Sequence, residues 1–348
     1  MTEKTRKPEF TPTMTAAVPY KDMEKTIQVI LENFPEAPCL PVMTRSIKWA
    51  LEGIPCLVFD RERREVFLDT SPEREAELFE FYDRYDAGDL DYFAFTREKA
   101  PWFYALLEVL KESRPEGLRW VHFETLGPIL MADVIKQPDG KASFQDETMR
   151  DILIKATNLK SKWLIKKIKD MIPGIEVITG LAETTLVNFT SAGGTGSKDE
   201  IVAAIDKGFE GLDCLAWVHC CANIDWTLLT DSKIDVINFD AFQHSDRLAL
   251  YYKEIKAFLE RGGMLAWGIV PVINDVFLKE SVNSLVKKLE KGISLFVEQG
   301  IDEELLAASS WVVPSCETVM MTPDLSDRAF STTREISRIM RRRYGFES

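Results

Sequence analysis

The chain has 348 residues, of which 45% are hydrophobic and 28% charged, and its formal net charge is −13. This composition is typical of a globular enzyme, and the acidic balance argues against a nucleic-acid partner, which would need a basic surface. Met1–Phe10 is charged and lacks the apolar core of a signal peptide, and no stretch reaches the roughly 18 consecutive apolar residues of a membrane span, so we expect a cytoplasmic protein that binds no membrane.

The first third of the chain is predicted to hold a helix, a β-hairpin and two further helices. The elements are, in order, a helix over Lys21–Phe34, a hairpin formed by Cys56–Phe59 and Val66–Leu68, a helix from Ser71 to Gly88 and a helix over Glu98–Glu112. Apolar spacing, Asp22 as a cap and Pro72 at a first helical position indicate the helices. We interpret residues 50–115 as a hairpin and helical insertion into a single domain that spans 1–348.

From Leu118 onward, short apolar strands alternate with amphipathic helices. The predicted strands are Trp120–Thr125, Ile175–Gly180, Cys214–His219, Val236–Phe239, Met264–Val270 and Trp311–Val313. The predicted helices are Glu147–Met171, Lys198–Gly208, Asp246–Glu260 and Val282–Gln299. This alternation indicates an α/β fold with parallel strands, and the length favours a single closed (β/α)8 TIM barrel.

An open, doubly wound sheet is the alternative architecture. Such sheets commonly carry a Gly-x-Gly-x-x-Gly turn after a strand, and no strand here is followed by one. The nearest match, Gly193-Gly194-x-Gly196, lacks the tight strand-to-helix context of a phosphate-binding turn, and we interpret it as a loop.

Three residues far apart in the sequence have the chemistry of a metal site. His219 and Cys221 end a strand two positions apart and so face the same way, whereas Cys220 faces elsewhere. Cys316 follows another apolar strand, so all three are expected at the carboxyl ends of barrel strands. Two thiolates and one imidazole suit zinc, and three protein ligands leave a fourth position for substrate. From the residues alone, buried thiols beside a hydrogen-bonded histidine are an equal alternative.

These motifs resemble a known family. From about Leu118 onward, and weakly at Thr13–Pro19, the chain resembles the C-terminal barrel of cobalamin-independent methionine synthase. It also resembles the wider superfamily of uroporphyrinogen decarboxylase and the methylcobamide:coenzyme M methyltransferases. The matching motifs are the His-x-Cys at His219-Cys220-Cys221 and the Pro-x-Cys at Pro314-Ser315-Cys316. The resemblance implies a Zn²⁺ cofactor on His219, Cys221 and Cys316, and it places Asp240 where the family has a zinc-binding glutamate.

The resemblance also implies a reaction, in which zinc holds an acceptor thiol as the thiolate that accepts a methyl group. The family's serine in Gly-Ser-x-Pro is replaced by Ala17, and its Asp-Glu-Pro resembles Ala182-Glu183-Thr184. Either Glu183 or Glu124 then binds the amino group of homocysteine, or the acceptor is a different thiol, such as one like coenzyme M. Ala17, His244 and Asn274 complete the predicted substrate-binding set.

The methyl donor implied by the single-barrel relatives is a methylcobamide. None of the three histidines has an aspartate two residues before it, so the chain lacks the Asp-x-His-x-x-Gly motif of corrinoid-binding domains. A methylcorrinoid would arrive free or on a partner corrinoid protein. The alternatives are an enzyme like uroporphyrinogen decarboxylase, which needs no metal, and a non-catalytic accessory protein that binds zinc or a corrinoid.

Overall fold

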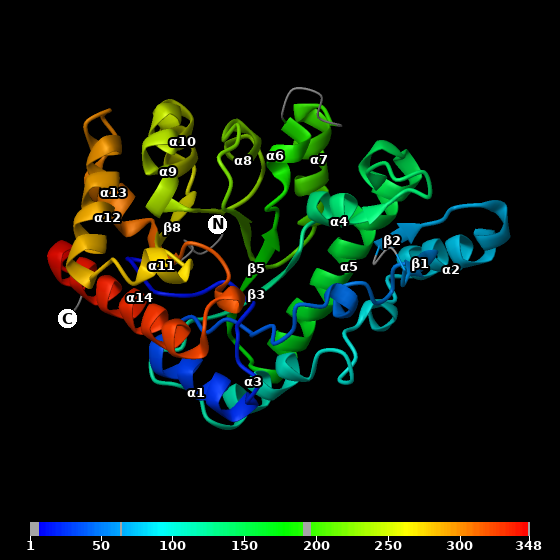
Figure 1. The fold of residues 1–348 in the computed structure, drawn as a ribbon, viewed down its shortest axis with the longest axis horizontal. Helices are drawn as coiled ribbons and strands as arrows, with labels where there is room; N and C mark the ends of the chain where they lie inside the picture. The colour runs from blue at the N-terminus through cyan, green and yellow to red at the C-terminus, as the bar shows by residue number, and fades with distance from the viewer. Residues whose placement is uncertain (1–6, 63–64, 191–195, 347–348) are drawn as a thin grey trace.

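The centre of the molecule is a curled, six-stranded parallel sheet surrounded by helices (Figure 1). The computed structural model describes residues 7–62, 65–190 and 196–346, so Gly193 and Gly194 of the predicted loop lie outside the described residues. The sheet order is β3-β5-β6-β7-β8-β9. The strands are β3 (Trp120–Leu126), β5 (Glu176–Ala182), β6 (Leu215–Cys220), β7 (Val236–Phe239), β8 (Met264–Val270) and β9 (Ser310–Pro314). All six coincide with predicted strands: β7 and β8 have the predicted ends, and the ends of the other four differ by at most two residues.

The predicted closed barrel of eight strands is wrong in its strand number, because the sheet of the described residues has six. The gap between β9 and β3 is spanned by two extended segments, 10–18 and 38–42. Their isolated parallel bridges are Pro12 to Val312, Ala17 to Val42 and Cys39 to His122. Prolines at both segments have no amide hydrogen for a regular ladder, which explains why these positions form bridges instead of strands.

Helices cover the outer face of the sheet between successive strands. The longer ones are α1 (Met23–Asn33), α5 (Glu147–Met171), α7 (Lys198–Gly208), α9 (Ala241–Leu248), α10 (Tyr252–Glu260), α12 (Val282–Val297) and α14 (Pro323–Tyr344). Shorter ones are α4 (Pro128–Val134), α6 (Leu186–Thr190), α8 (Thr227–Thr230), α11 (Asn274–Phe277) and α13 (Glu303–Ala308). Among the described residues, no helix is both long enough and apolar enough to cross a bilayer.

The predicted hairpin forms at the expected residues. Strands β1 (Leu57–Asp60) and β2 (Glu65–Leu68) pair antiparallel, and β2 also pairs with the short β4 (Ile135–Lys136). With α2 (Glu75–Asp86), the hairpin projects from the side of the ring, whereas α3 (Pro101–Glu112) packs near α1 (Figure 1). That 50–115 is an insertion into one domain stays a prediction.

Strand alternation separates two cores. Residues of the six strands that point into the ring form one small cluster, in which Trp217 contacts Trp311, with ring centroids 5.8 Å apart. Residues that point outward, such as Val218 and Cys220, belong to the larger core beneath the helices. The ring interior is therefore filled by side chains, and space for a ligand remains only at a strand end.

Candidate metal centre

His219, Cys221 and Cys316 meet at the carboxyl ends of β6 and β9. Leu215 and Trp217 point into the ring, so two-residue alternation carries His219 to the same side, whereas Cys220 is buried on the helix side. Cys316 follows β9, after Ser315, whose amide donates to the carbonyl of Val270 at 2.8 Å. The predicted register of β6 is thus the one observed.

The distances between the three ligand atoms match a tetrahedral zinc site. Cys316 Sγ lies 3.7 Å from Cys221 Sγ and 3.5 Å from His219 Nε2, and all three atoms lie within 4.8 Å of one another. Zinc bonds of about 2.3 Å to sulfur and about 2.0 Å to nitrogen would separate two sulfurs by about 3.8 Å and sulfur from nitrogen by about 3.5 Å. These residues therefore fit the ion, although binding itself stays a prediction.

Asn238 fixes the orientation of His219. Its Oδ1 lies 2.6 Å from His219 Nδ1, and its Nδ2 donates to the carbonyl of Ala266 on β8 at 3.1 Å. Because the amide nitrogen is already donating, Oδ1 is the acceptor and Nδ1 of His219 carries the hydrogen. In the neutral imidazole, Nε2, which faces the thiols, then has the free lone pair, and this is the tautomer that binds a metal.

Gly268 allows the strand ends to approach each other. A Cβ atom at this position of β8 would lie 2.5 Å from the carbonyl oxygen of Phe239 and 2.8 Å from Cα of Ser315. Neither backbone atom can move alone, because Ser315 is held by its hydrogen bond to Val270. Glycine at 268 is therefore part of what places Cys316 beside Cys221.

Asp240, the fourth predicted ligand, lies outside the three-residue group. It is the N-cap of α9, where its Oδ1 accepts from the amide of Gln243 at 2.9 Å and its Oδ2 accepts from Nε2 of Gln243 at 2.6 Å. Both oxygens are thus occupied by hydrogen bonds. Burial raises the pKa of this carboxyl, while Gln243 and the nearby His244 and His219 oppose the shift.

Glu183, a predicted substrate residue, lies at the start of α4. Its two oxygens accept from the amides of Ile129 at 3.1 Å and Leu130 at 2.7 Å, so it caps the N-terminus of α4. Burial raises the pKa of Glu183 to about 8, and the two amide donors oppose that rise. Gly127 is required for this arrangement, because a Cβ there would lie 2.1 Å from the Glu183 carboxylate.

Glu124 is near the metal centre, together with a residue that the sequence analysis missed, Glu317. Glu124 is 5% exposed, and its Oε2 accepts from the amide of Ala16 at 3.1 Å. Burial raises the pKa of Glu124, while the neighbouring His219 lowers it. Burial and the negative charge of Glu124 raise the pKa of Glu317 to about 7, against an opposing influence of His219. Its place directly after Cys316 was the signal available in the sequence.

The remaining predicted substrate residues lie on three separate segments, and none of them belongs to the three-residue group. Ala17 is buried in segment 10–18, one of the two extended segments between β9 and β3, and forms a bridge with Val42. His244 is half-buried in the first turn of α9, and its amide donates to the carbonyl of Asp240. Asn274 begins α11, and its buried Oδ1 has no hydrogen-bond partner.

Electrostatics within the cluster couple the histidine to its neighbours. Burial alone would lower the pKa of His219, but Cys221, Glu124 and Asn238 together outweigh it and raise the pKa to about 9. Hydrogen bonding to Cys316, followed by burial, raises the pKa of the Cys221 thiol. A divalent cation would favour the opposite protonation states, neutral imidazole and thiolates, so metal binding would release protons. His122, also inside the ring, has its pKa lowered to about 3 by burial.

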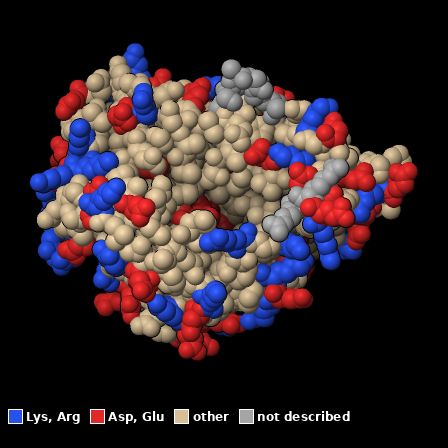
Figure 2. Space-filling model, viewed as in Figure 1, with Lys and Arg blue, Asp and Glu red and all other residues tan. Residues whose placement is uncertain are grey.

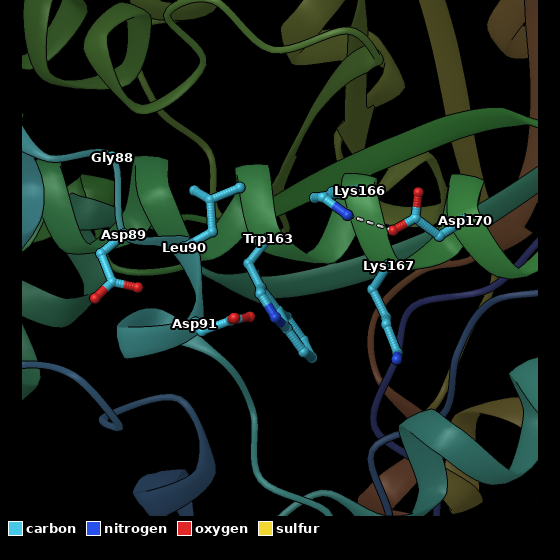
Figure 3. A pocket seen from close by; sticks show the side chains of 8 residues that line it. All are labelled: Gly88, Asp89, Leu90, Asp91, Trp163, Lys166, Lys167 and Asp170. Atoms are coloured by element: carbon cyan, nitrogen blue, oxygen red, sulfur yellow. Dashed lines mark hydrogen bonds and ion pairs between the residues drawn. The ribbon is translucent and has the colours of Figure 1, made fainter.

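The surface is hollowed over the centre of the ring. Figure 2 shows acidic side chains at the floor of this hollow, a largely uncharged surround and a basic side chain at its edge. A separate groove of about 430 Å³ lies between Gly88–Asp91 and the second half of α5, and it is lined by Trp163, Lys167 and the Lys166–Asp170 ion pair (Figure 3). That part of α5 leads back to the start of β5, so this groove is away from the carboxyl ends that carry His219.

Among solved structures, a match covers nearly the whole chain. No family model matches the chain, and no curated protein matches its sequence. A solved structure of a B12-independent methionine synthase from Shewanella sp. W3-18-1, in complex with selenomethionine, has a TM-score of 0.56, with 12% sequence identity. The match covers 96% of this chain and 98% of that one. The shared feature is the methionine-synthase barrel fold. At this identity the likeness extends to the fold alone, and the description B12-independent gives the expected methylcobamide no support.

Proposed function

We propose that this protein is a zinc-dependent thiol methyltransferase, in which His219, Cys221 and Cys316 hold the ion that binds the acceptor thiol. The observation that carries the proposal is the convergence of the three ligand atoms at zinc spacing. The methionine-synthase-like fold and the hollow over the ring support it. Three protein ligands leave one position for an incoming sulfur, which is the arrangement of a catalytic rather than a structural site.

When bound, zinc would stabilise the acceptor sulfur as a thiolate at neutral pH. The proton of the thiol is released to solvent. The thiolate attacks the methyl carbon, the sulfur–carbon bond forms as the bond to the donor breaks, and the electron pair leaves with the donor. The protein contributes position: Asn238 holds the His219 ring, and Gly268 lets Cys316 reach the other two ligands.

The first test compares cysteine variants. Because Cys221 and Cys316 supply ligand atoms, Cys221→Ser and Cys316→Ser are each expected to lose stoichiometric zinc and, with it, thiol methylation. Cys220→Ser is the matched control, since its side chain is buried on the helix side of the same strand. Zinc content is measured by elemental analysis of the purified protein. Loss of zinc from Cys220→Ser with retention in Cys221→Ser would contradict the assigned site.

A second measurement identifies the acceptor thiol and the methyl donor. Zinc-loaded protein is assayed with homocysteine and coenzyme M as acceptors, each with methylcobalamin and with a methylfolate as donors, and the methylated thiol is quantified. The methylcorrinoid, free or on a partner corrinoid protein, remains our predicted donor. Zinc binding without methylation of any thiol would favour the accessory-protein alternative, and the absence of both zinc and thiol methylation would favour the decarboxylase-like one.

A further inference from the structure

Two of the six cysteines lie close enough to react with each other. Cys221 Sγ is 3.7 Å from Cys316 Sγ, and no other pair of thiols in the described residues, which include all six cysteines, is hydrogen-bonded. The sulfurs of a disulfide are about 2.0 Å apart, so these two need to approach by about 1.7 Å to form a bond. The two cysteines are 95 positions apart in the sequence, so only the fold brings them together.

Neither thiol belongs to a strand. Cys221 directly follows β6, and Cys316 lies two residues after the end of β9. Each sulfur is therefore attached to a loop residue. Rotation about the Cα–Cβ bonds and a small shift of the loops can bring the two sulfurs together without displacing a strand.

Both thiols are within reach of a small reagent. They are half-buried, whereas the buried cysteines are Cys39, Cys56 and Cys220. Cys214 is also half-buried, but it precedes β6 and so lies at the opposite, amino end of that strand, and no other thiol is hydrogen-bonded to it. The six cysteines thus include one accessible pair and one accessible single thiol, and the single thiol is an internal control.

We infer that Cys221 and Cys316 form an oxidation site, at which a hydroperoxide links the two sulfurs in a reversible disulfide and the metal centre loses its ion. The inference goes beyond methyl transfer, and its zinc-release step rests on the proposed metal site. Because the thiolate is the form of cysteine that binds metal, a disulfide leaves His219 as the only one of the three ligands. A zinc site needs three or four protein ligands, so each disulfide releases one ion.

The oxidation proceeds in two steps. The sulfur of one cysteine attacks the terminal oxygen of the hydroperoxide, the O–O bond breaks, and a sulfenic acid forms as the alcohol leaves, or water in the case of hydrogen peroxide. The second sulfur then attacks the first, the S–S bond forms as the S–O bond breaks, and the departing hydroxide takes up a proton as water. The two thiols lose two electrons and the peroxide gains them. Two thiols and one hydroperoxide thus give one disulfide, one alcohol and one water.

The test treats zinc-loaded and metal-free protein with hydrogen peroxide. Peptide mass spectrometry without reduction is expected to find Cys221 linked to Cys316, and the free-thiol count should fall from six to four. The zinc-loaded protein should release one equivalent of zinc per disulfide, measured with a chromophoric chelator. Dithiothreitol should restore both thiols and the capacity to bind zinc, because exchange between a disulfide and a dithiol is reversible.

Matched cysteine variants identify the linked pair. Cys214→Ser removes the accessible single thiol and should keep both the disulfide and the zinc release. Cys220→Ser removes the thiol next to Cys221, which is buried on the helix side of β6, and it should also keep the disulfide. Cys316→Ser should form no disulfide within the chain, and its Cys221 should stop at the sulfenic acid, which dimedone labels for detection by mass.

The outcomes separate this oxidation site from the proposed methyltransferase. A disulfide that includes Cys220, or two sulfinic acids in place of a disulfide, would overturn the inference even if the protein bound zinc and methylated thiols. Zinc release while all six thiols stay reduced would overturn it as well. A reversible link between Cys221 and Cys316 in a protein that binds no zinc when reduced would instead support the thiol pair and refute the proposed zinc-dependent function.

Discussion

Asn238 determines which nitrogen of His219 faces the two thiols. Its acceptor oxygen holds Nδ1–H at 2.6 Å, and its own amide is fixed by the carbonyl of Ala266. Outer partners of metal-binding histidines set both the tautomer and the ring angle. Asn238, on the neighbouring strand β7, therefore sets the orientation of the predicted ligand His219 without being a ligand itself.

Replacement of Asn238 tests this role. Asn238→Ala is expected to weaken zinc binding by about 10-fold to 100-fold, because the imidazole loses its acceptor and can rotate. Asn238→Asp keeps an acceptor oxygen and should restore much of the affinity. The measurement is zinc competition against a chromophoric chelator. Wild-type affinity in Asn238→Ala would show that packing alone orients the ring.

Two of the predicted site residues, Asp240 and Glu183, are cap residues in the structure. Asp240 and Glu183 were assigned to metal and substrate from a family resemblance, but each accepts backbone amides at a helix start. The cap of Asp240 is local and could have been predicted from the helix that begins at the next residue. The cap of Glu183 could not, because its partners on α4 lie more than 50 positions earlier in the sequence.

At the scale of elements, β8 controls how closely its neighbours approach. Its register with β9 shifts between Gly268 and Val270, at the level where β9 ends and the chain turns to Cys316. Gly268 has no side chain to hold the backbone of Ser315 away. The position of the Cys316 thiol thus depends on the shape of β8, a strand that contributes no ligand.

Gly268→Ala is expected to push Ser315 and Cys316 away from β6. Overpacking of this kind costs about 1–3 kcal/mol of folding free energy, and we expect zinc affinity to fall with it. Gly208→Ala is the control, because a Cβ there would meet the flexible end of Leu181 at 3.2 Å and the ring of Pro128 at 3.9 Å, and no backbone atom is among these neighbours. Chemical denaturation and zinc competition give the two quantities. An unaltered zinc affinity in Gly268→Ala would exclude the proposed steric role.

At the scale of the whole molecule, a buried lysine joins residues 50–115 to α5. Lys160, on α5, is 2% exposed, and its Nζ donates to the carbonyl of Glu52 at 2.5 Å and lies 3.5 Å from that of Phe93. Burial lowers the pKa of Lys160 to about 7, although Glu52 opposes the shift. The contact between residues 50–115 and α5 therefore includes a group, the Lys160 amine, whose pKa lies near neutral pH.

Lys160 should make stability depend on pH. Between pH 7 and about 10.5 the unfolded chain binds this proton more tightly than the folded one, so the free energy of unfolding rises with pH across that window. The slope is at most about 1.4 kcal/mol per pH unit, and it vanishes below the folded pKa, where both states are protonated. Denaturant titrations should show this slope in the wild type and in the control Lys162→Met, but not in Lys160→Met. A slope that survives in Lys160→Met would assign it to other groups.

The sequence predicts the strands and helices of this molecule better than the two segments that close the ring between β9 and β3. Apolar strands and amphipathic helices from Leu118 onward follow simple periodicity. The alternation of side chains along β6 correctly predicts that Cys220 faces the opposite side from His219 and Cys221. The two closing segments lack that periodicity and contain prolines, so their place in the ring depends on contacts with β9 and β3. The electrostatic interaction between Glu317 and the distant Glu124 likewise depends on the fold and could not be predicted from the sequence.

The ring closes between residues from opposite parts of the chain, and this has a consequence during synthesis. The amide of Thr13 donates to the carbonyl of Val312 at 3.1 Å, about 300 positions later. At translation speeds of about 5–20 residues per second, the early segment waits roughly 15–60 s for its partner to leave the ribosome. Cys316 follows Val312 by only a few residues. The nascent chain is therefore expected to acquire its metal-binding capacity and the closure of its ring together, once this part of the chain has left the ribosome.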